Sequence, residues 1–382
     1  MTSLDNPKPV LHEHVSCELL LTTACNLACR YCIAKQLLPS TMTLDLAQRA
    51  VDMFIYLAEG ATSVEFVFTG GEPLLQFPLL RELVAYIEDV ADNAQMNPGL
   101  VVKTNGTILT PEIVEFFRQH RVRVVVSIDG PAEVHDLQRR SLQDMGTYTS
   151  VSHNMLSLIN NEVECTASLT VHPQLSASVL SNVQHLHRLG VRTIDVGPAY
   201  GTVTWNPVEA ESLASSLMAI ASYMREVNGS SEQLVVGPLY RESEHVAEQL
   251  RNSWGCRAAS SNLAVLPDGR VTGCSSLAML VRGFPELVVG SVSEGLDEGA
   301  VARLCDLAQA GPARRSACQQ CQTGANCSGG CLAINYASTG RPLDPPQFYC
   351  GTIAAIPAAW RCAWTHPGPQ SRPVADPLLR AG

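Results

Sequence analysis

The sequence predicts an α/β fold with parallel strands, followed by a smaller cysteine-rich region. Between residue 16 and about residue 200, six strand-like segments alternate with helix-like segments, and no hairpin turn joins them. This order is typical of parallel strands with helices outside, in either a barrel or a doubly wound sheet. Polar and glycine-rich stretches follow the strands, which is where such sheets place their chemistry. After about residue 250 the chain changes to a short hairpin and irregular, cysteine-dense segments.

Apolar runs and their spacing locate the individual elements. The predicted strands are residues 16–22, 63–68, 99–104, 122–128, 162–171 and 191–197. The predicted helices are residues 41–60, 77–91, 110–120 and 177–190, with 201–250 mostly helical. A Pro-Asp-Gly turn predicts a β-hairpin over residues 262–276. The tail from residue 351 is rich in proline and alanine, and we expect it to wrap around the fold or fray.

Composition excludes some functional classes. The 382 residues are 46% hydrophobic with a net charge of −10, which indicates a globular protein and argues against nucleic-acid or anionic-membrane partners. No apolar run is long enough to span a bilayer, and the first residues lack the pattern of a secretory signal, so we expect a cytoplasmic location. Stable disulfides are rare there, so the 14 cysteines favour metal binding or catalysis.

The first cysteine cluster is "LTTACNLACRYCIAKQ", in which Cys25, Cys29 and Cys32 follow the first predicted strand. Zinc would require a fourth Cys or His, and residues 33–60 contain neither. A [4Fe–4S] cluster held by three thiolates, with one iron open to an external ligand, fits the spacing better. Core cysteines that merely lie close together are the simpler alternative. Cys17 is out of spacing, and we expect it to be buried.

This C-x3-C-x2-C motif, with Tyr31 before the third cysteine, resembles the radical S-adenosylmethionine (radical SAM) superfamily. The other motifs that carry the resemblance follow in the order of that family, each after a predicted strand. They are "TGGEP" (69–73), "TNGT" (104–107), "SIDG" (127–130) and "PAEVHDLQRR" (131–140), which contains His135, Asp136 and Arg139. The resemblance covers roughly residues 15–230 and implies a partial (β/α)6 TIM-like barrel.

The resemblance also implies a reaction. The open iron would bind S-adenosylmethionine, an electron from the cluster would break its S–C5′ bond, and the 5′-deoxyadenosyl radical would abstract a substrate hydrogen. A flavodoxin or ferredoxin would supply the electron. The expected cofactor-binding residues are Tyr31, Gly70, Gly71, Glu72, Pro73, Thr104, Asn105, Ser127, Asp129 and Arg139. Glu72 and the Gly70–Gly71 backbone suit the ammonium group, and Arg139 suits the carboxylate. Ser127 could hydrogen-bond the cofactor, and Asp129 would either contact it or cap its own turn.

A second cysteine array lies near the C-terminus. Twelve residues separate Cys256 from Gly269, and four separate Gly269 from Cys274. The remaining members are Cys318, Cys321, Cys327, Cys331 and Cys350. A structural zinc ribbon is the simpler alternative. The full array resembles the seven-cysteine SPASM extension of radical SAM enzymes, which carries two auxiliary [4Fe–4S] clusters.

The SPASM resemblance implies how the cysteines are shared between the two clusters. The outer cluster would be held by Cys318, Cys321, Cys327 and Cys350, and the inner one by Cys256, Cys274 and Cys331. Relatives with a full inner shell have an extra cysteine shortly after the first, whereas this chain reads "CRAASSN". The inner cluster therefore either has an open iron or is closed by Cys305, Cys362 or a non-cysteine ligand. Cys165 is predicted to be a core residue.

These inferences divide the chain into four parts. They are an N-terminal arm (1–15), the radical SAM partial barrel (16–235), a cysteine-rich α+β SPASM domain with a β-hairpin (236–350) and the Pro/Ala-rich tail (351–382).

The resemblance implies an oxidoreductase that abstracts hydrogen from a peptide and leads to oxidative crosslinking or dehydrogenation, as in ribosomal peptide maturation. The alternative substrate is a small molecule such as a sugar, aminoglycoside or nucleoside, for dehydrogenation or sulfur transfer. A non-catalytic electron carrier would leave "TGGEP" unexplained. Sulfatase-maturing members of the group have an Asp base directly after the cysteine of the hairpin, whereas Ser275 follows Cys274 here. This difference weakens the interpretation that the chain matures a sulfatase. The base is unassigned: His172 and Tyr200 are predicted at the reactive end of the barrel, where packing is the simpler role.

Overall fold

The structure is a computed structural model that describes residues 14–61, 63–228, 233–239, 256–310, 314–315, 318–321 and 330–364. Its described strands form one eleven-stranded sheet in the order β11-β10-β9-β8-β1-β2-β3-β4-β5-β6-β7. The predicted ligand Cys327, most of the predicted N-terminal arm and the end of the tail lie outside the described residues.

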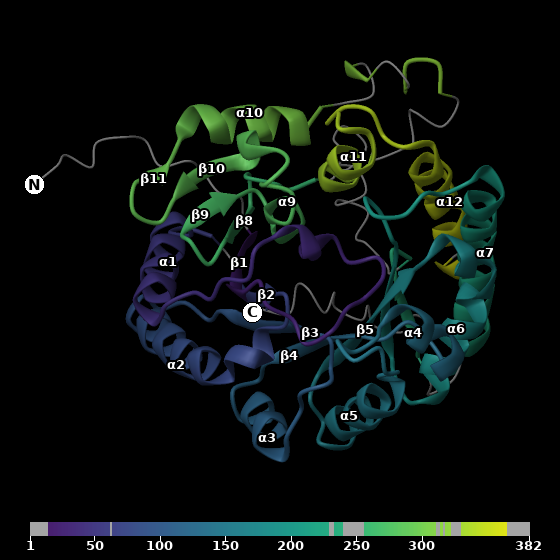
Figure 1. Ribbon diagram of the computed structural model, residues 1–382, viewed down its shortest axis with the longest axis horizontal. Helices are drawn as coiled ribbons and strands as arrows, with labels where there is room; N and C mark the ends of the chain where they lie inside the picture. Colours follow the sequence, from purple (N-terminus) through teal and green to yellow (C-terminus); the bar gives the residue numbers. More distant parts are fainter. Residues whose placement is uncertain are drawn as a thin grey trace, which may run out of the picture.

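Seven of these strands form the expected parallel sheet. They are β1 (His14–Thr22), β2 (Ser63–Gly70), β3 (Gly99–Thr104), β4 (Arg123–Ser127), β5 (Cys165–Val171), β6 (Thr193–Pro198) and β7 (Val235–Gly237). Each pairs in parallel with the next. In Figure 1 the sheet curves, and the helices form an arc around its convex side. The α/β fold with a partial barrel is therefore confirmed. The predicted domain boundary at residues 235 and 236 falls inside β7.

Helices connect the parallel strands. They are α1 (Leu44–Leu57), α2 (Phe77–Asn93), α3 (Pro111–Gln119), α4 (Ala132–Gln138), α5 (Tyr148–Asn160), α6 (Val179–Arg188) and α7 (Pro207–Val227), with the short 3-10 helices η1 (Ile33–Gln36), η2 (Pro73–Gln76) and η3 (Pro173–Ser178). Side-chain caps fix where several of these helices begin. Thr43 accepts from Leu46 N at the start of α1, and Asn206 forms a capping box with Glu209 at the start of α7. We did not expect α4 or α5 from the sequence.

The C-terminal region continues the same sheet on the other side of β1. Its elements are β8 (Asn262–Val265), β9 (Arg270–Thr272), α9 (Ser275–Ala278), η4 (Pro285–Leu287), β10 (Val288–Ser291), β11 (Gly295–Leu296), α10 (Glu298–Ala308), α11 (Leu332–Thr339) and α12 (Gln347–Trp364). The predicted hairpin is present as β8 and β9, and β8 pairs in parallel with β1. Figure 1 shows this region along the open side of the barrel, from β8 beside β1 to α12 beside α7.

The expectation for the tail was wrong as far as Trp364. Residues 347–364 form the helix α12, which packs along α7 and contains Pro357. Ala359 and Ala363 are buried, so small side chains allow the two helices to approach closely. The alanine content that suggested a frayed tail is instead a helix-packing surface. None of the helices in the described part of the chain combines the length and apolar character needed to cross a bilayer.

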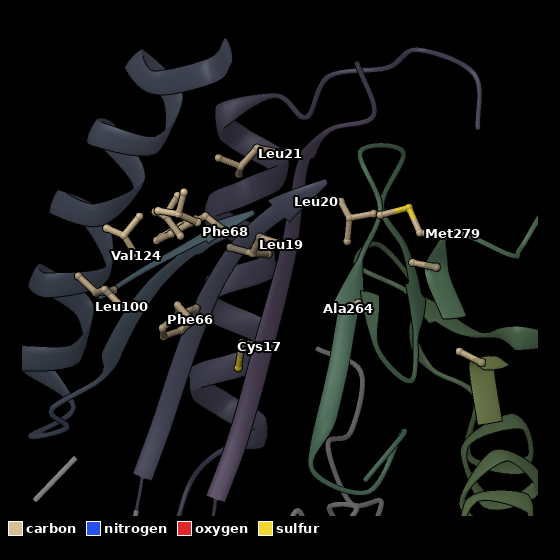
Figure 2. Close-up of a cluster of buried hydrophobic side chains, with 14 of the residues drawn as sticks. Cys17, Leu19, Leu20, Leu21, Phe66, Phe68, Leu100, Val124, Ala264 and Met279 are labelled. Atoms are coloured by element: carbon tan, nitrogen blue, oxygen red, sulfur yellow. The ribbon is translucent and has the colours of Figure 1, made fainter. Parts of the chain in front are cut away.

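The main core lies between the convex face of the sheet and the helices. Along β1, Cys17, Leu19 and Leu21 point to this face, whereas Leu20 points to the other side, toward Met279 (Figure 2). The alternation follows from the period of two in a strand. Cys17 is fully buried, as predicted, and Cys165 packs against the same core. Because the core covers the convex face, the polar residues lie on the concave face and at the ends of the strands.

Candidate functional site

The first cysteine loop joins β1 to η1 at the carboxyl end of the barrel. Cys29 is buried with Leu27 and Tyr31, and Cys25 and Cys32 pack against the same small cluster. Burial raises the pKa of the Cys29 thiol to about 11, an effect that the nearby Arg139 charge opposes and the other two thiols reinforce. The structure therefore brings the three predicted ligands together.

Two glycines let β2 approach this loop closely. Gly71 N donates to Thr22 O at 2.8 Å, and Glu72 N donates to Ala24 O at 2.9 Å. A Cβ on Gly70, whose φ is +131°, would lie 2.1 Å from Thr22 O, and one on Gly71 would lie 2.2 Å from Ala24 O. Any side chain at either position would push the cysteine loop away from β2. The "TGGEP" glycines thus position the thiols.

Glu72 is fully buried and tied to the end of β3. Its Oε1 accepts from Leu74 N at 3.0 Å and from Thr104 Oγ1 at 2.7 Å, and its Oε2 accepts from Asn105 N at 2.7 Å. Burial raises the pKa of Glu72, and these hydrogen bonds counteract the rise. Pro73, at the start of η2, is also buried. The predicted contact of Glu72 with an ammonium group stays a prediction, since three of its lone pairs already serve the protein.

Asn105 connects β3 with the cysteine loop. Its Nδ2 donates to Asn26 Oδ1 at 2.8 Å and lies 3.7 Å from Cys25 Sγ, while its Oδ1 accepts from Thr107. Leu27 N also donates to Cys25 Sγ, at 3.4 Å. Such donors stabilise a thiolate and the iron–sulfur group that it would hold. Asn105 therefore lies beside a predicted ligand, a contact that the sequence alone did not predict.

A buried ion pair closes the other side of the loop. Arg139 donates from Nε to Asp129 Oδ2 at 2.9 Å and from Nη2 to Oδ1 at 3.1 Å. Tyr31 OH donates to Asp129 Oδ2 at 2.6 Å, and the guanidinium lies over the Tyr31 ring, 5.3 Å from its centroid. Although burial opposes its charge, Asp129 raises the pKa of Arg139 further above its usual value. Asp129 thus holds Arg139 and Tyr31, rather than only capping its turn, and the predicted Arg139–carboxylate contact stays a prediction.

The chain around Arg139 also grips the cysteine loop through its backbone. Ala28 N donates to Arg140 O at 2.8 Å, and Arg30 N donates to Gln138 O at 2.9 Å. These bonds are made by the residues on either side of Arg139. The last turn of α4 and the loop of the thiols therefore form one unit.

His135 and Asp136 of the same motif are scaffold residues. His135 Nδ1 accepts from Asp129 N at 3.4 Å, so its Nε2 carries the proton and donates to Thr147 Oγ1 at 3.0 Å. Thr147 Oγ1 in turn donates to Arg139 O at 2.7 Å. Burial, together with the Arg139 charge, lowers the pKa of His135 to about 4, which keeps the ring neutral. Asp136 Oδ1 accepts from Thr147 N at 2.7 Å and from Tyr148 N at 2.8 Å, which holds the first residues of α5 in place.

Two predicted site residues keep hydrogen-bonding capacity on the reactive side. Ser127 ends β4 in register with Ser168 on β5, and its side chain is half-buried. His172 follows β5, and its Nδ1 is buried without a hydrogen-bond partner in the described part of the chain. Burial lowers the pKa of His172, which keeps the imidazole neutral near pH 7. His172 Nδ1 is therefore available to a ligand at the carboxyl end of β5.

The first site fits an iron–sulfur group better than a single ion. In the described part of the chain, no three His, Cys, Asp or Glu side chains converge as they would around one metal ion. Cys25, Cys29 and Cys32 nevertheless interact electrostatically, so ionising them together requires compensating positive charge, which iron supplies. Together these features suit a cluster held at three corners.

The inner cysteines form a second triad between α9, α11 and the start of β8. Cys274 immediately precedes α9, Cys331 precedes α11, and Cys256 lies just before the strand β8. Burial raises the pKa of all three thiols, that of Cys331 to about 11. The charge of Cys256 adds to the rise at Cys331, and the charges of Glu18, Cys331 and Cys256 add to it at Cys274. Backbone donors face the sulfurs, including those of Ala333 and Ile334 toward Cys331 and Leu332 toward Cys256. This donor set also fits an iron–sulfur group.

Cys305 and Cys362, the two cysteines considered as a fourth ligand of the inner site, lie apart from each other. Cys305 on α10 is close to Cys256 and lies 4.0 Å from Ala258 O. Cys362 on α12 instead lies 3.6 Å from Ser222 Oγ on α7. Of these two candidates, only Cys305 has a described interaction with a member of the inner triad.

The outer cysteines lie nearer the surface. Cys321 N donates to Cys318 O at 3.1 Å, so these two share one turn, and Cys321 and Cys350 are exposed. Cys350 lies in the first turn of α12. None of the thirteen cysteines in the described part of the chain forms a disulfide. A fourth ligand at Cys327 stays a prediction.

A charged pair on the concave face was missed by the sequence analysis. Glu18 is 5% exposed, and its Oε1 accepts from Lys103 Nζ at 2.8 Å, while its Oε2 accepts from Ser275 N, next to Cys274. Burial alone would raise the pKa of Glu18, but Lys103 and Ser275 hold it below its usual value. The sequence does contain a signal for this pair, since Glu18 and Lys103 are each a single charged residue inside an apolar strand. The pair joins the barrel to the hairpin that carries Cys274.

Comparison with known proteins agrees with this geometry. The family described as "Radical SAM superfamily" matches residues 19–210. The serine-type anaerobic sulfatase-maturating enzyme of Klebsiella aerogenes is 25% identical over 333 residues, which cover 83% of this chain and 80% of that protein. The enzyme of the same description from Bacteroides thetaiotaomicron is 31% identical over 159 residues, which cover 39% of this chain and 37% of that protein.

Solved structures share the fold over most of the chain. Native anSMEcpe with bound AdoMet and Cp18Cys peptide superposes with a TM-score of 0.74 at 16% identity, covering 92% of this chain and 99% of that one. Streptococcus suis SuiB bound to the precursor peptide SuiA gives a TM-score of 0.63 at 12% identity, covering 88% of this chain and 75% of that one. These spans include the C-terminal cysteine-rich region as well as the barrel.

Proposed function

Because the chain belongs to the radical SAM superfamily, we propose that it is a SPASM-type oxidoreductase that abstracts a hydrogen atom from a peptide substrate. The product would be an oxidative crosslink or a dehydrogenated residue. The observation that carries the proposal is the partly buried three-thiol loop at the carboxyl end of β1, clamped by Glu72 from β2 and by the Asp129–Arg139 pair. When bound, the cluster and S-adenosylmethionine supply the one-electron chemistry that removes the hydrogen.

The residues of the chain position the reaction and exclude water. Cys25, Cys29 and Cys32 would hold the first cluster, and the surrounding network fixes their loop so that the thiols need no rearrangement. Ser127 and His172 present polar atoms to the reactive side. Leu27, Tyr31 and Ala199 shield the thiols from solvent, which limits side reactions of a radical.

A peptide substrate is supported by the relatives. The Klebsiella aerogenes relative is a sulfatase-maturating enzyme, and the anSMEcpe and SuiB structures contain a peptide. We further propose that the inner and outer cysteines hold two auxiliary [4Fe–4S] clusters, which would accept one electron from the substrate radical that remains after hydrogen abstraction. A flavodoxin or ferredoxin would reduce the first cluster. Clusters and free thiols require a reducing compartment, so we place the enzyme in the cytoplasm.

The test is anaerobic reconstitution followed by activity measurements. Three clusters require iron and sulfide counts of about twelve each. Cys29→Ala is expected to abolish formation of 5′-deoxyadenosine, whereas Cys318→Ala is expected to retain it and to lose turnover of the substrate. Retained cleavage in Cys29→Ala would refute the assignment of the first site.

The substrate class is tested by co-expression with short peptides encoded beside the gene. Loss of two hydrogens from one of them, read as a mass decrease of about 2 Da, is the expected result for crosslinking or dehydrogenation. Full S-adenosylmethionine cleavage with no mass change in any peptide, but with oxidation of a sugar or nucleoside, would replace the peptide by a small molecule.

A further inference from the structure

The surface beside the first thiols is formed by the cysteine loop and by the chain that follows α4. Backbone bonds join the two segments, since Ala28 N donates to Arg140 O at 2.8 Å. One turn further, Arg30 N donates to Gln138 O at 2.9 Å. Cys29, which is 9% exposed, lies between Ala28 and Arg30 on the same strip of chain. A partner that covers this strip would therefore come close to the first thiols without entering the barrel.

The chain after α4 exposes apolar side chains next to this strip. Leu27 and Ser141 form an antiparallel bridge, and Ser141 N donates to Met145 O at 2.9 Å, so a tight turn is held against the cysteine loop. On this turn Leu142 is 64% exposed and Met145 65%, and Leu137 near the end of α4 is 46% exposed. Single exposed apolar residues are common on protein surfaces, whereas three so close together favour an interaction site.

Basic side chains lie beside the apolar ones. Arg30 and Lys35 extend from the cysteine loop and from η1, and both are exposed. Lys35 Nζ donates to Ala28 O at 3.2 Å, which holds the ammonium group over the strip. Neither cation has an ion-pair partner in the described part of the chain. At the end of η1, Arg282 Nη1 donates to Gln36 O at 3.2 Å and extends the row of cations.

The charge of this surface differs from that of the whole protein. In the segment after α4, Arg140 pairs with Asp144, and Asp136 is the other accessible carboxylate. Three accessible cations of the two segments, Arg30, Lys35 and Arg140, therefore stand against two carboxylates. The chain as a whole has a net charge of −10. The first thiols thus lie beside a positive surface on an otherwise acidic protein.

We propose that the surface formed by Arg30, Lys35, Leu137, Leu142 and Met145, which we call the ladder surface, docks an acidic one-electron carrier of the flavodoxin or ferredoxin class. This rests on the proposed function, which requires an electron at the first thiols. The docked carrier would lose one electron, and the iron–sulfur group held by the cysteine loop would gain it. Charge complementarity selects an acidic partner and speeds its arrival. A few apolar side chains suit the small interface of a transient electron-transfer complex.

The experiment measures 5′-deoxyadenosine formation by the reconstituted full-length enzyme, with an acidic bacterial flavodoxin as the varied reactant. An NADPH-dependent reductase keeps the flavodoxin reduced. At low salt, Arg30→Glu/Lys35→Glu is expected to lower kcat/KM for flavodoxin about tenfold, because repulsion replaces attraction between the two surfaces. The difference should shrink as salt is added, since screening weakens both. Reduced methyl viologen, a small cation, should drive the variant at least as fast as the wild type.

A second pair of charge reversals controls for the change in net charge. Arg225→Glu/Arg303→Glu alters two exposed cations on α7 and α10, outside the ladder surface. This variant carries the same net charge as Arg30→Glu/Lys35→Glu. It should keep the kcat/KM of the wild type for flavodoxin, so that a loss in the first variant is local to the ladder surface.

The apolar part of the ladder surface is tested by Leu142→Ser/Met145→Ser. This variant leaves the charges in place and changes only exposed side chains, so it should raise the KM for flavodoxin about threefold and keep the salt dependence. Val208→Ser/Met218→Ser on α7 is the matched control, since these side chains are 73% and 38% exposed. It should leave the KM for flavodoxin unchanged.

Several outcomes would overturn the proposal. An unchanged kcat/KM for flavodoxin in Arg30→Glu/Lys35→Glu would show that the carrier docks elsewhere. If that variant also loses activity with methyl viologen, its thiol loop is damaged, and an unchanged KM for flavodoxin in Leu142→Ser/Met145→Ser then rejects the surface. A raised KM for the peptide substrate, with methyl viologen as reductant, would assign the surface to the substrate instead. Failure of the proposed function is recognised separately, because the wild type then forms no 5′-deoxyadenosine with either reductant.

Discussion

The two thiol triads are held in different ways. The first depends largely on side chains: Asn105 after β3 bonds Asn26 in the cysteine loop, and Asp129 after β4 holds Tyr31 and Arg139. Glu72 secures Asn105 through its carboxylate and the loop through its backbone N–H. The inner triad depends on backbone donors at helix starts and on one carboxylate, Glu18, at Ser275. A side-chain network concentrates the stability of a site in a few buried groups, whereas a backbone frame spreads it over the packing of whole elements. Single substitutions should therefore damage the first site more than the second.

Arg139→Met is expected to have the largest effect. It leaves the buried carboxylate of Asp129 without its partner, which costs about 3–5 kcal/mol of unfolding free energy. Anaerobic denaturant unfolding and iron content measure the change, and the first cluster should be lost before the inner one. The double variant Asp129→Asn/Arg139→Met removes both charges and should recover part of the loss. If the double variant is no more stable than the single one, the ion pair is not the cause.

The neutral His135 gives the first site a pH dependence. Its pKa is about 4 in the folded protein against 6.5 for an ordinary histidine, so the unfolded chain binds an additional proton between these values. This difference contributes about 3 kcal/mol to the free energy of unfolding. The contribution is complete above pH 6.5 and is lost as the pH falls from 6.5 toward 4. Unfolding free energies measured across this range should show the slope in the wild type. His135→Gln should flatten it, and an equal slope in both proteins would exclude His135 as its source.

A pair of glycine substitutions compares the two sites directly. Gly71→Ala places a Cβ 2.2 Å from the backbone oxygen of Ala24, while Gly273→Ala places one 2.8 Å from the flexible end of Leu304 and no closer than 3.0 Å to backbone, at Ala259 N. Backbone moves less easily than a side-chain tip, so Gly71→Ala should cost about 1–3 kcal/mol and Gly273→Ala less. The first should deplete iron at its site, as read by absorbance and iron count. Equal or reversed losses would contradict the contrast between the sites.

Tyr31→Phe should have the smallest effect. It deletes one hydrogen bond to a charged acceptor but keeps the ring against Arg139, and Asp129 retains Arg139 and Thr170 as donors. We expect a loss of about 1.5 kcal/mol in unfolding free energy, with the three thiols still able to bind iron. A loss as large as that of Arg139→Met would mean that Tyr31, not the ion pair, closes the loop.

Local sequence determined the barrel because its signals are short-range. Apolar runs, helix starts such as Thr110-Pro111 and the glycines of "TGGEP" each constrain a few neighbouring residues. The helix α4 was missed because it is short, and the start of α5 depends on Asp136, which accepts from Thr147 N and Tyr148 N. The spacing of Val151, Met155 and Leu158 was an available signal for α5. The tail was misjudged because its prolines disfavour a helix, and only the packing on α7 shows that its alanines lie on the buried side of α12.

By itself, the sequence determined the parallel α/β fold, the three-thiol loop after the first strand and the spacing of the C-terminal cysteines. These follow from residue type and separation along the chain. The pairing of Asp129 with Arg139 and the contact of Glu18 with Ser275 come from the tertiary structure alone. Such contacts join residues from 10 to more than 250 positions apart, and their partners are selected by strand order and packing, which no local pattern encodes.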